Sequence, residues 1–424
     1  MNVLHLNTLM NGGAASGAYR LHLALKSIGI NSKMIVQKKT NCDDDDVIEV
    51  PKTKLGYQEE RVESKILSKL RVNHNEGQYF YLPQMLLQNN NNNIIDAIPF
   101  KPDLLIVHWT TVFANVKTFY QISKRFDIPV IWYMTDMEPM TGGCHYSFDC
   151  TGLFNSCSGC PALQFPLKFF AKYWLKQKKE YIAKTNMQIV ASSSYMLDKA
   201  NNATVFEGKR KHLVLRGIDD KIFSPVSSRN DIRKKWGVDE DKLVIFFGAQ
   251  SLTDPRKGMK VLLQALKCLY TKLEKDVQLR DSVQVVFAGR DCFKEDDILF
   301  KSKFVGFMKT QQDLASMYQL ADVFVCPTLQ DSGPMMASES LMCGTPVAGF
   351  KMGVLPDVVI DGETGFLADV GDAEGLAKAL EKIVTLSEPD RGQMRKNCRE
   401  FAEKHLTYNK QAEGILRVYE SFGR

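Results

Sequence analysis

The stretch ADVFVCPTLQDSGPMMASESLMCGTPV, residues 321–347, contains a predicted strand, a loop and a predicted helix in direct succession. The apolar run at 323–326 is typical of a strand that is buried on both faces. The run MMASESLMC then predicts a helix that stops at Gly344, and Pro334 fits its first turn. This succession indicates one strand–loop–helix step of a parallel sheet.

Similar apolar runs recur along the chain, and helical patterns such as residues 19–25 and 376–384 lie between them. The runs cover residues 3–6, 104–107, 130–134, 189–191, 244–247, 285–288 and 323–326. Alternating strands and helices predict an α/β fold with two Rossmann-like, doubly wound domains that face a cleft.

The polar stretch FSPVSSRNDIRKKWG, residues 223–237, separates two such series of strands. We therefore expect an N-terminal domain at 1–220 and a C-terminal domain at 221–408. A final helix within 409–424 is expected to pack back on the N-terminal domain.

The composition is that of a globular protein: of 424 residues, 44% are hydrophobic and 25% are charged. The net charge of +6 fits an anionic small ligand or an anionic lipid surface, and without a dense Lys/Arg stripe it argues against nucleic acid. No run approaches the roughly 18 apolar residues of a membrane span. Ten cysteines without a secretory leader predict reduced thiols and a cytoplasmic protein.

The loop after the strand at 323–326 has the features of an anion site. Backbone N–H groups near the predicted helix start suit the charge of a diphosphate, and Gly333 lets a ligand approach closely. The residues expected to bind it are Ser332, Gly333, Pro334, Met335 and Met336.

Two carboxylates frame this turn. Asp331 is placed to orient a sugar ring, and Glu339 to hold the two hydroxyls of a ribose. The alternative is that Asp331 caps the helix and Glu339 is a solvated helix residue.

A basic pair, Arg256 and Lys257, follows the strand VIFFGAQ on the same sheet edge. Two fixed cations there can neutralise a leaving nucleoside diphosphate without a metal cofactor. Gly248 and Gln250, at the end of that strand, are expected to contact the same donor. The alternative is a solvated basic turn.

Together these motifs resemble the retaining glycosyltransferases of family four, which have the two-domain GT-B fold. The matching positions are Lys257–Gly258, Asp331 with Glu339, Gly344–Thr345–Pro346, DGETGF at 361–366 and RGIDDKIFSP at 216–225. The resemblance covers nearly the whole chain. It implies an acceptor-binding N-terminal domain and a C-terminal domain that binds a UDP- or GDP-linked sugar.

Some positions depart from the family pattern. Asp331 stands where glutamate is usual, and Arg216 where asparagine is usual. The arginine that often follows the first C-domain strand is missing, so Arg256 is expected to supply its charge. Thr135 occupies the place of a donor-contacting histidine, and Asp136 follows it.

An imidazole from elsewhere is therefore needed if the missing histidine is replaced. His108, at the end of the strand LLIVH, and His145 are the two candidates, and each can equally be structural. In the first strand–helix loop, NGGAASG, Gly12 and Gly13 are expected to contact donor or acceptor. The alternative for that loop is a tight turn.

The segment around His145 is rich in cysteine and resembles exopolysaccharide and lipopolysaccharide enzymes of that family. Cys144, Cys150, Cys157 and Cys160 fall within seventeen residues and end in C-x-x-C-P. Four soft ligands at this density suit a structural zinc ion. Buried thiols or a redox-labile pair are the alternatives.

Residues 165–179 interleave aromatic and basic side chains. The pattern suits an amphipathic helix on an anionic bilayer, and equally a core-packed helix with a lysine-rich outer face.

The sequence thus predicts a retaining, metal-independent hexosyltransferase that acts on a saccharide or lipid-linked saccharide in surface polysaccharide synthesis, peripheral to the inner face of the plasma membrane. The alternatives are a sugar-nucleotide epimerase on the same fold and a non-catalytic nucleotide-sugar-binding scaffold protein.

Overall fold

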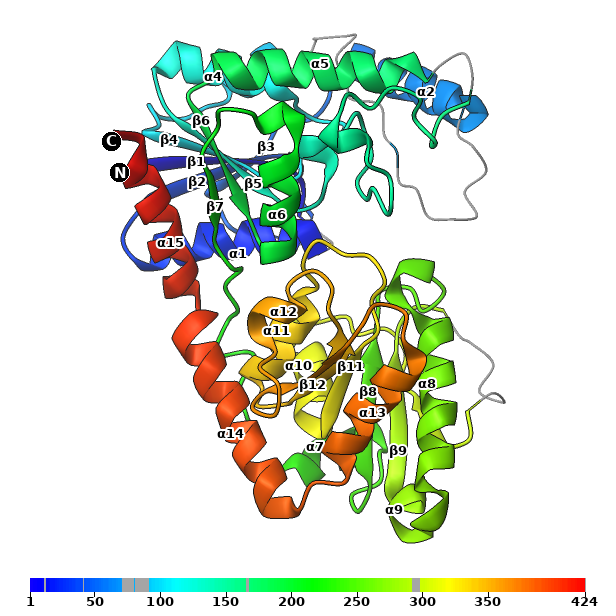
Figure 1. Ribbon diagram of the computed structural model, residues 1–424. Coiled ribbons are helices and arrows are strands. Elements are labelled where there is room, and N and C mark those ends of the chain that lie inside the picture. Colours follow the sequence, from blue (N-terminus) through cyan, green and yellow to red (C-terminus); the bar gives the residue numbers. More distant parts are fainter. Residues whose placement is uncertain are drawn as a thin grey trace. The chain divides into compact units, whose positions relative to one another are not determined.

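The chain forms two compact α/β units in the computed structural model, which describes residues 1–10, 13–40, 42–70, 80, 91–164, 168–291 and 298–423 (Figure 1). Unit 1 comprises Met1–Gly217 and Tyr408–Arg424, and unit 2 comprises Ile218–Thr407. The sequence predicted domain boundaries after residues 220 and 408, and the units meet after Gly217 and Thr407.

Within the described residues, unit 1 is built on a parallel sheet in the order β3-β2-β1-β4-β5-β6-β7. The strands are β1 (Asn2–Leu9), β2 (Asn31–Lys38), β3 (Val47–Glu49), β4 (Leu104–Val107), β5 (Val130–Met134), β6 (Met187–Ala191) and β7 (Lys211–Leu213). The helices are α1 (Gly13–Ser27), α2 (Lys54–Leu70), α3 (Asn91–Asp96), α4 (Val116–Phe126), α5 (Phe169–Lys184), α6 (Ser194–Asn202) and α15 (Tyr408–Glu420).

Both faces of this sheet are covered, as the continuous apolar strands require. On β5, Trp132 points to a core shared with α4, α5 and α6, and Tyr133 points to a second core shared with α1 and α15. Figure 1 shows α4 and α5 on one side of the sheet and α1 and α15 on the other.

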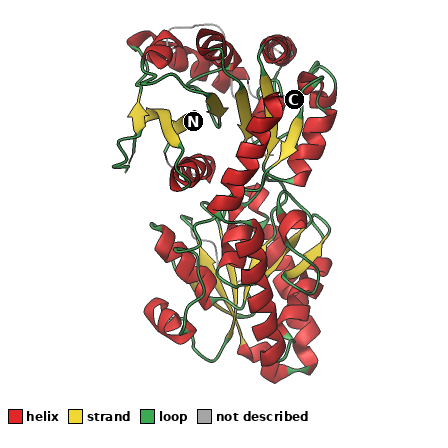
Figure 2. Ribbon diagram, turned by 90° about the vertical axis from the view of Figure 1, so that its left-hand side faces the viewer, coloured by secondary structure: helices red, strands yellow, loops and turns green. Residues whose placement is uncertain are grey.

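Unit 2 has a parallel sheet in the order β10-β9-β8-β11-β12-β13, and Figure 2 shows helices on both sides of it. The strands are β8 (Leu243–Gly248), β9 (Val283–Ala288), β10 (Lys301–Phe304), β11 (Val323–Cys326), β12 (Val347–Phe350) and β13 (Gly365–Ala368). The helices are α7 (Arg229–Trp236), α8 (Met259–Lys272), α9 (Val277–Ser282), α10 (Gln311–Leu320), α11 (Met335–Met342), α12 (Leu355–Val358), α13 (Ala373–Val384) and α14 (Glu388–His405).

Each sheet has a point at which the strand order reverses. It lies between β1 and β4 in unit 1 and between β8 and β11 in unit 2. Open parallel sheets bind ligands beyond the carboxyl ends of the strands at such a point. The loops that follow β8 and β11 are therefore the first place to look for a site in unit 2.

Unit 2 is inserted into unit 1, because the chain leaves unit 1 at Gly217 and returns to it at Tyr408. The N–H of Ile218 donates to the carbonyl of Leu406 over 2.7 Å, which ties the two crossing segments together. The returning helix α15 adds Ala412, Ile415 and Val418 to the core beside α1.

Every apolar run predicted from the sequence lies in a strand, and the predicted helices at 19–25 and 376–384 lie in α1 and α13. Among the described residues, no helix is long and apolar enough to cross a membrane.

Candidate functional site

The two loops at the reversal point of unit 2 are joined through their backbones. The N–H of Leu329, after β11, donates to the carbonyl of Arg256, after β8, over 2.8 Å. Gly258 has φ +75°, and a Cβ atom there would lie 1.8 Å from the carbonyl oxygen of Pro327. Only glycine allows this approach, so Lys257–Gly258 fixes one loop against the other.

Lys257 and Asp331 meet at this junction. Lys257 Nζ donates to Asp331 Oδ2 over 2.6 Å, and the N–H of Gly333 donates to Asp331 Oδ1 over 3.0 Å. Burial raises the pKa of the Asp331 carboxyl, but the Lys257 charge and these hydrogen bonds outweigh burial and hold the pKa below its ordinary value. The two residues form an ionised, mostly buried pair.

Asp331 does not cap helix α11. The residue at the N-cap of α11 is Pro334, which makes no side-chain capping bond. The capping alternative for Asp331 is therefore wrong, and so is the placement of Pro334 inside the first turn. Met335 begins the helix, and the first N–H groups of any helix lack partners within it.

Glu339 is buried inside α11, with 3% of its surface exposed. Its Oε2 accepts a 3.0 Å hydrogen bond from the hydroxyl of Tyr318 on α10. The solvated-residue alternative for Glu339 is therefore wrong. Tyr318 was missed by sequence reasoning, because nothing in its local pattern points to a carboxylate 21 positions later.

Arg256 is held by Asp254, the residue that caps the short 3-10 helix Pro255–Lys257. Asp254 accepts from the Arg256 backbone N–H over 3.0 Å and from Nη2 over 2.6 Å. The Arg256 side chain is only 12% exposed, so the turn is not simply solvated. Asp254 was not predicted, although the dipeptide Asp254–Pro255 is a recognisable turn signal.

The other donor-site candidates are spread around these pairs. A Cβ atom at Gly248 would come within 2.9 Å of Met336 Cε, which places the end of β8 against the start of α11. Ser332 is buried and Gln250 is exposed. Gly13 begins α1, and Gly12 lies outside the described residues.

A second polar cluster lies beyond β5 in unit 1. His145 Nδ1 is 2.6 Å from Asp136 Oδ2, and the Trp109 indole nitrogen lies 3.2 Å from the same Nδ1. The hydroxyl of Thr111 lies 3.4 Å from Nε2. Asp136 and His145 are both buried, so two sequence candidates that lie nine positions apart form one pair.

His108 is not part of that cluster. Its Nε2 lies 2.9 Å from Nδ1 of His5, and its ring packs edge-on against Tyr133. Burial lowers the pKa of His108 to about 3, so the ring is neutral at physiological pH. Its surroundings are those of a structural histidine.

Thr135, which stands where a histidine was expected, contacts Arg216 through its backbone: the carbonyl of Thr135 accepts from Nη2 of Arg216 over 3.3 Å.

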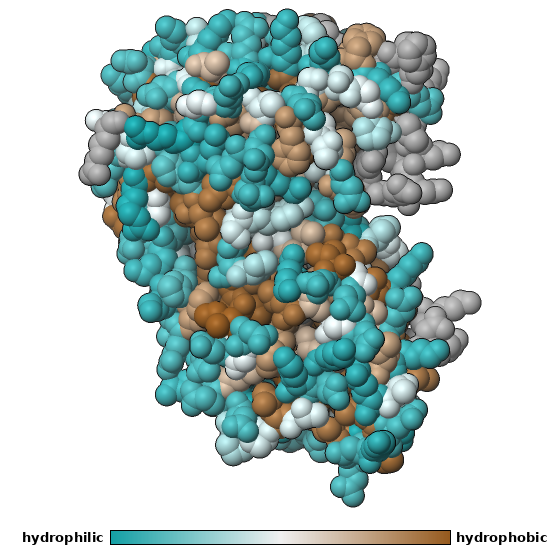
Figure 3. Space-filling model, in the orientation of Figure 1, coloured by the Kyte–Doolittle hydropathy of each residue, from teal (hydrophilic) through white to brown (hydrophobic). Residues whose placement is uncertain are grey.

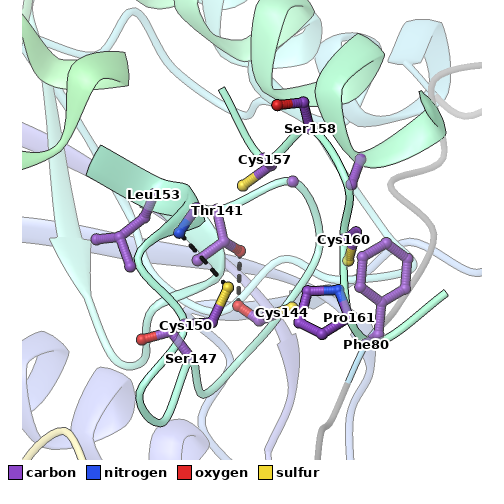
Figure 4. A pocket seen from close by; sticks show the side chains of 13 residues that line it. Phe80, Thr141, Cys144, Ser147, Cys150, Leu153, Cys157, Ser158, Cys160 and Pro161 are labelled. Atoms are coloured by element: carbon purple, nitrogen blue, oxygen red, sulfur yellow. Dashed lines mark hydrogen bonds between the residues drawn. The ribbon is translucent and has the colours of Figure 1, made fainter. Parts of the chain in front are cut away.

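The four clustered cysteines line one pocket of about 30 Å³ in unit 1 (Figure 4). Hydrogen bonding from the Cys144 thiol lowers the pKa of Cys160 to about 7, whereas burial raises that of Cys157 to about 11. As the side chains stand, no three His, Cys, Asp or Glu residues in the described part of the chain are grouped to hold a metal ion.

The segment predicted at 165–179 forms α5 from Phe169 onward, and residues 165–167 lie outside the described part. Trp174 and Leu175 are buried in the unit 1 cores. Phe169 is 56% exposed, and the outer face beside it carries Lys172 and Lys176. The side of α5 that is visible in Figure 3 is mainly hydrophilic.

Comparison with known proteins finds relatives for unit 2 and for the fold of the whole chain. Residues 228–405 match the family model described as Glycosyl transferases group 1. The chain is 30% identical over 215 residues to D-inositol 3-phosphate glycosyltransferase of Saccharomonospora viridis, covering 48% of each chain. It is 22% identical over 239 residues to N-acetyl-alpha-D-glucosaminyl L-malate synthase of Bacillus anthracis, covering 55% of this chain and 58% of the other. The chain thus spans about half the length of these curated relatives.

Two solved structures resemble the chain along almost its whole length. Sucrose-phosphate synthase from Thermosynechococcus elongatus has a TM-score of 0.65 at 17% identity and covers 100% of this chain and 99% of its own. HepE of Anabaena, in complex with UDP-glucose, has a TM-score of 0.61 at 14% identity and covers 99% of this chain and 100% of its own. At such identities the likeness shows the fold alone. The fold is GT-B, as expected, and the match to the glycosyl transferases group 1 model lies within unit 2.

Proposed function

We propose that this protein is a retaining glycosyltransferase that uses a nucleotide-sugar donor, bound at the Lys257–Asp331 junction of unit 2. The observation that carries the proposal is the 2.6 Å contact between these two side chains beside the start of α11, at the reversal point of the sheet. The group 1 match over unit 2 supports the same reaction class.

The donor diphosphate would bind between Lys257 and the N-terminus of α11. A lysine ammonium has three N–H donors, and only one is used by Asp331 Oδ2, so Lys257 can hold a phosphate oxygen as well. The helix N-terminus adds partial positive charge. Arg256, oriented by Asp254, would supply a second cation when the nucleoside diphosphate leaves.

The sugar and the ribose would be held by the two carboxylates. Asp331 is ionised and can accept hydrogen bonds from sugar hydroxyls, while the N–H of Gly333 fixes its other oxygen. Tyr318 sets the orientation of Glu339, whose carboxylate suits a ribose diol. Asp331 lies in the loop after β11, and Glu339 lies in α11, the helix that follows this loop.

In the proposed reaction the bond between the anomeric carbon and the diphosphate oxygen breaks, and an acceptor oxygen takes its place on the same face. The acceptor proton passes to the leaving phosphate oxygen. Lys257 and Arg256 stabilise the charge that develops on this group, in the role that a divalent ion plays elsewhere. The reaction therefore needs no metal.

The acceptor is proposed to be a saccharide or lipid-linked saccharide of surface polysaccharide synthesis that contacts the Asp136–His145 pair. The exposed Phe169 and Lys172 of α5 suit contact with an anionic bilayer. We therefore propose that the protein is cytoplasmic and binds the inner face of the plasma membrane. Since HepE is described with UDP-glucose, UDP-sugars are the first donors to try, followed by GDP-sugars.

The test is a thermal-shift panel of UDP- and GDP-sugars on the full chain, followed by product analysis with and without a lipid-linked saccharide. We expect one donor to raise the melting temperature and to be consumed with acceptor, giving a product of retained configuration in the presence of a chelator. If the donor is epimerised in the absence of acceptor, the protein is an epimerase instead. If a donor stabilises the protein and is never consumed, the protein is a nucleotide-sugar-binding scaffold.

A pair of variants localises the donor. Asp331→Asn should abolish the thermal shift, whereas Asp369→Asn should keep it, because Asp369 pairs with Lys351 on the exposed surface of the same unit. A donor shift that survives Asp331→Asn would place the donor elsewhere.

A further inference from the structure

The four cysteines of unit 1 lie in a segment with little regular structure. Between the 3-10 helix Glu138–Met140 and α5, the described residues form the 3-10 helix Gly152–Phe154 and isolated bridges, one of which joins Cys144 to Phe80. Two non-glycine residues in this segment, Phe148 and Cys157, have positive φ values of 46° and 52°. Such backbone persists only where other interactions hold it.

The cysteine side chains converge on one small space (Figure 4). The pocket of about 30 Å³ is large enough for a metal ion or a water molecule. The rest of its lining is largely apolar and includes Phe80, Leu153, Pro161 and Ala171. Four sulfur atoms are therefore the principal ligands that this pocket offers.

A backbone N–H group points at one of the four sulfur atoms. The N–H of Gly152 lies 3.5 Å from Cys150 Sγ. A neutral thiol is a weak acceptor, whereas a thiolate that binds a metal is commonly fixed by such donors.

Two of the sulfur atoms lie beside Gly152. A Cβ atom at Gly152 would lie 3.4 Å from Cys150 Sγ and 3.5 Å from Cys157 Sγ. No three of the four sulfur atoms surround one point as they stand. Rotation about χ1 moves each Sγ between staggered positions, and the missing side chain of Gly152 leaves space for this.

We propose that Cys144, Cys150, Cys157 and Cys160 turn into this pocket to bind one Zn²⁺ ion in a tetrahedral thiolate site. Four thiolates favour zinc, and each cysteine that binds releases its proton to solvent without any redox change. The bound ion pins the loop that carries His145 to the end of β5. The proposal does not depend on the transferase activity, because none of these cysteines takes part in the proposed transfer.

The first measurement is the metal content of the full chain, purified without chelators, by inductively coupled plasma mass spectrometry. We expect about one zinc per chain. Replacing the zinc with Co²⁺ should give the intense near-ultraviolet absorption of thiolate-to-cobalt charge transfer. Both readings use the unaltered protein, so they decide the question even if a variant fails to fold.

Variants then assign the ligands. Cys150→Ser and Cys157→Ser should each weaken zinc retention against a competing chelator by more than about tenfold, since even outer-shell changes have effects of that size. Cys268→Ser, which removes a half-buried cysteine of α8 in unit 2, should keep the full zinc content.

Three results would overturn the proposal. Far less than one zinc per chain, with no uptake of added Zn²⁺ or Co²⁺, would leave four ordinary thiols. A disulfide between Cys144 and Cys160 in the non-reduced protein would replace the metal by a covalent link. Iron with acid-labile sulfide would replace zinc by a cluster.

Discussion

The donor-site junction of unit 2 and the cysteine-rich loop of unit 1 hold buried polar side chains in different ways. Lys257 and Asp331 lie in the loops that follow two neighbouring strands, and backbone contacts at Gly258 and Leu329 fix these loops. His145 reaches Asp136 from a long loop with little regular structure. The Lys257–Asp331 pair is positioned by loops anchored at the sheet edge. The Asp136–His145 pair depends on the interactions that hold the cysteine-rich loop in place. Substitutions at the donor-site junction should therefore affect the use of the donor alone, and substitutions at the Asp136–His145 pair should affect the KM for the acceptor.

The largest effect is expected at Lys257. Lys257→Ala removes the cation beside the leaving diphosphate and should lower kcat by about 10²–10³-fold. Initial rates at saturating donor and acceptor measure this. Lys260→Ala, an exposed lysine one helical turn away, should stay within about twofold of the wild type, since isolated surface changes have small effects. Near-normal activity of Lys257→Ala would remove the phosphate role from this junction.

The loop of unit 1 should respond through the acceptor. Asp136→Asn replaces the charged partner of His145 and should raise KM for the acceptor about tenfold, the size of one hydrogen bond to a charged group. KM for the donor should not change. Asp127→Asn, on an exposed αL residue after α4 that asparagine also tolerates, is the control. A rise in donor KM instead would show that the two regions do not divide the substrates.

A smaller effect is expected behind the donor site. Tyr318→Phe removes the hydroxyl that orients Glu339 and should raise KM for the donor about fivefold, the equivalent of about 1 kcal/mol. KM for the acceptor should stay constant. The control is Tyr270→Phe, the same change on α8 against Phe300. Equal kinetics for both variants would argue against a ribose contact by Glu339.

The smallest effect concerns stability. The folded pKa of Asp331 lies below its ordinary value, so its ion pair stabilises the fold above the unfolded pKa of about 3.9 and loses this contribution as pH falls through the folded pKa. The difference in urea midpoint between wild type and Asp331→Asn should be constant from about pH 5 to 8 and narrow below about pH 4. A difference that grows on acidification would contradict the ion pair.

The same contrast explains what the sequence could predict. Apolar runs such as that of β11 identify buried strands, and residues just beyond them reach the sheet edge by topology alone, as Lys257 and Asp331 do. Edge strands such as β7 (KHL) and β10 (KSKF) are short and polar, so they carry no such signal. Partners that meet only through packing, such as Tyr318 with Glu339, cannot be inferred from local pattern.

His108 shows the limit from the other side. It follows a buried strand just as Lys257 and Asp331 do, yet it packs against His5 and Tyr133 rather than joining Asp136. Spacing along a strand gives the edge of the sheet at which a side chain lies. The direction in which that side chain turns depends on neighbours that are distant in sequence.

The insertion of unit 2 into unit 1 has a consequence for how the chain folds during synthesis. The ribosome completes residues 218–407 before it makes α15, whose Ala412, Ile415 and Val418 close the unit 1 core beside α1. While unit 2 is being made, the nascent unit 1 therefore still exposes Val3, Leu21 and Leu25. Until α15 is added, that apolar face lacks its cover, and exposed apolar surface of this kind favours aggregation of the unfinished chain.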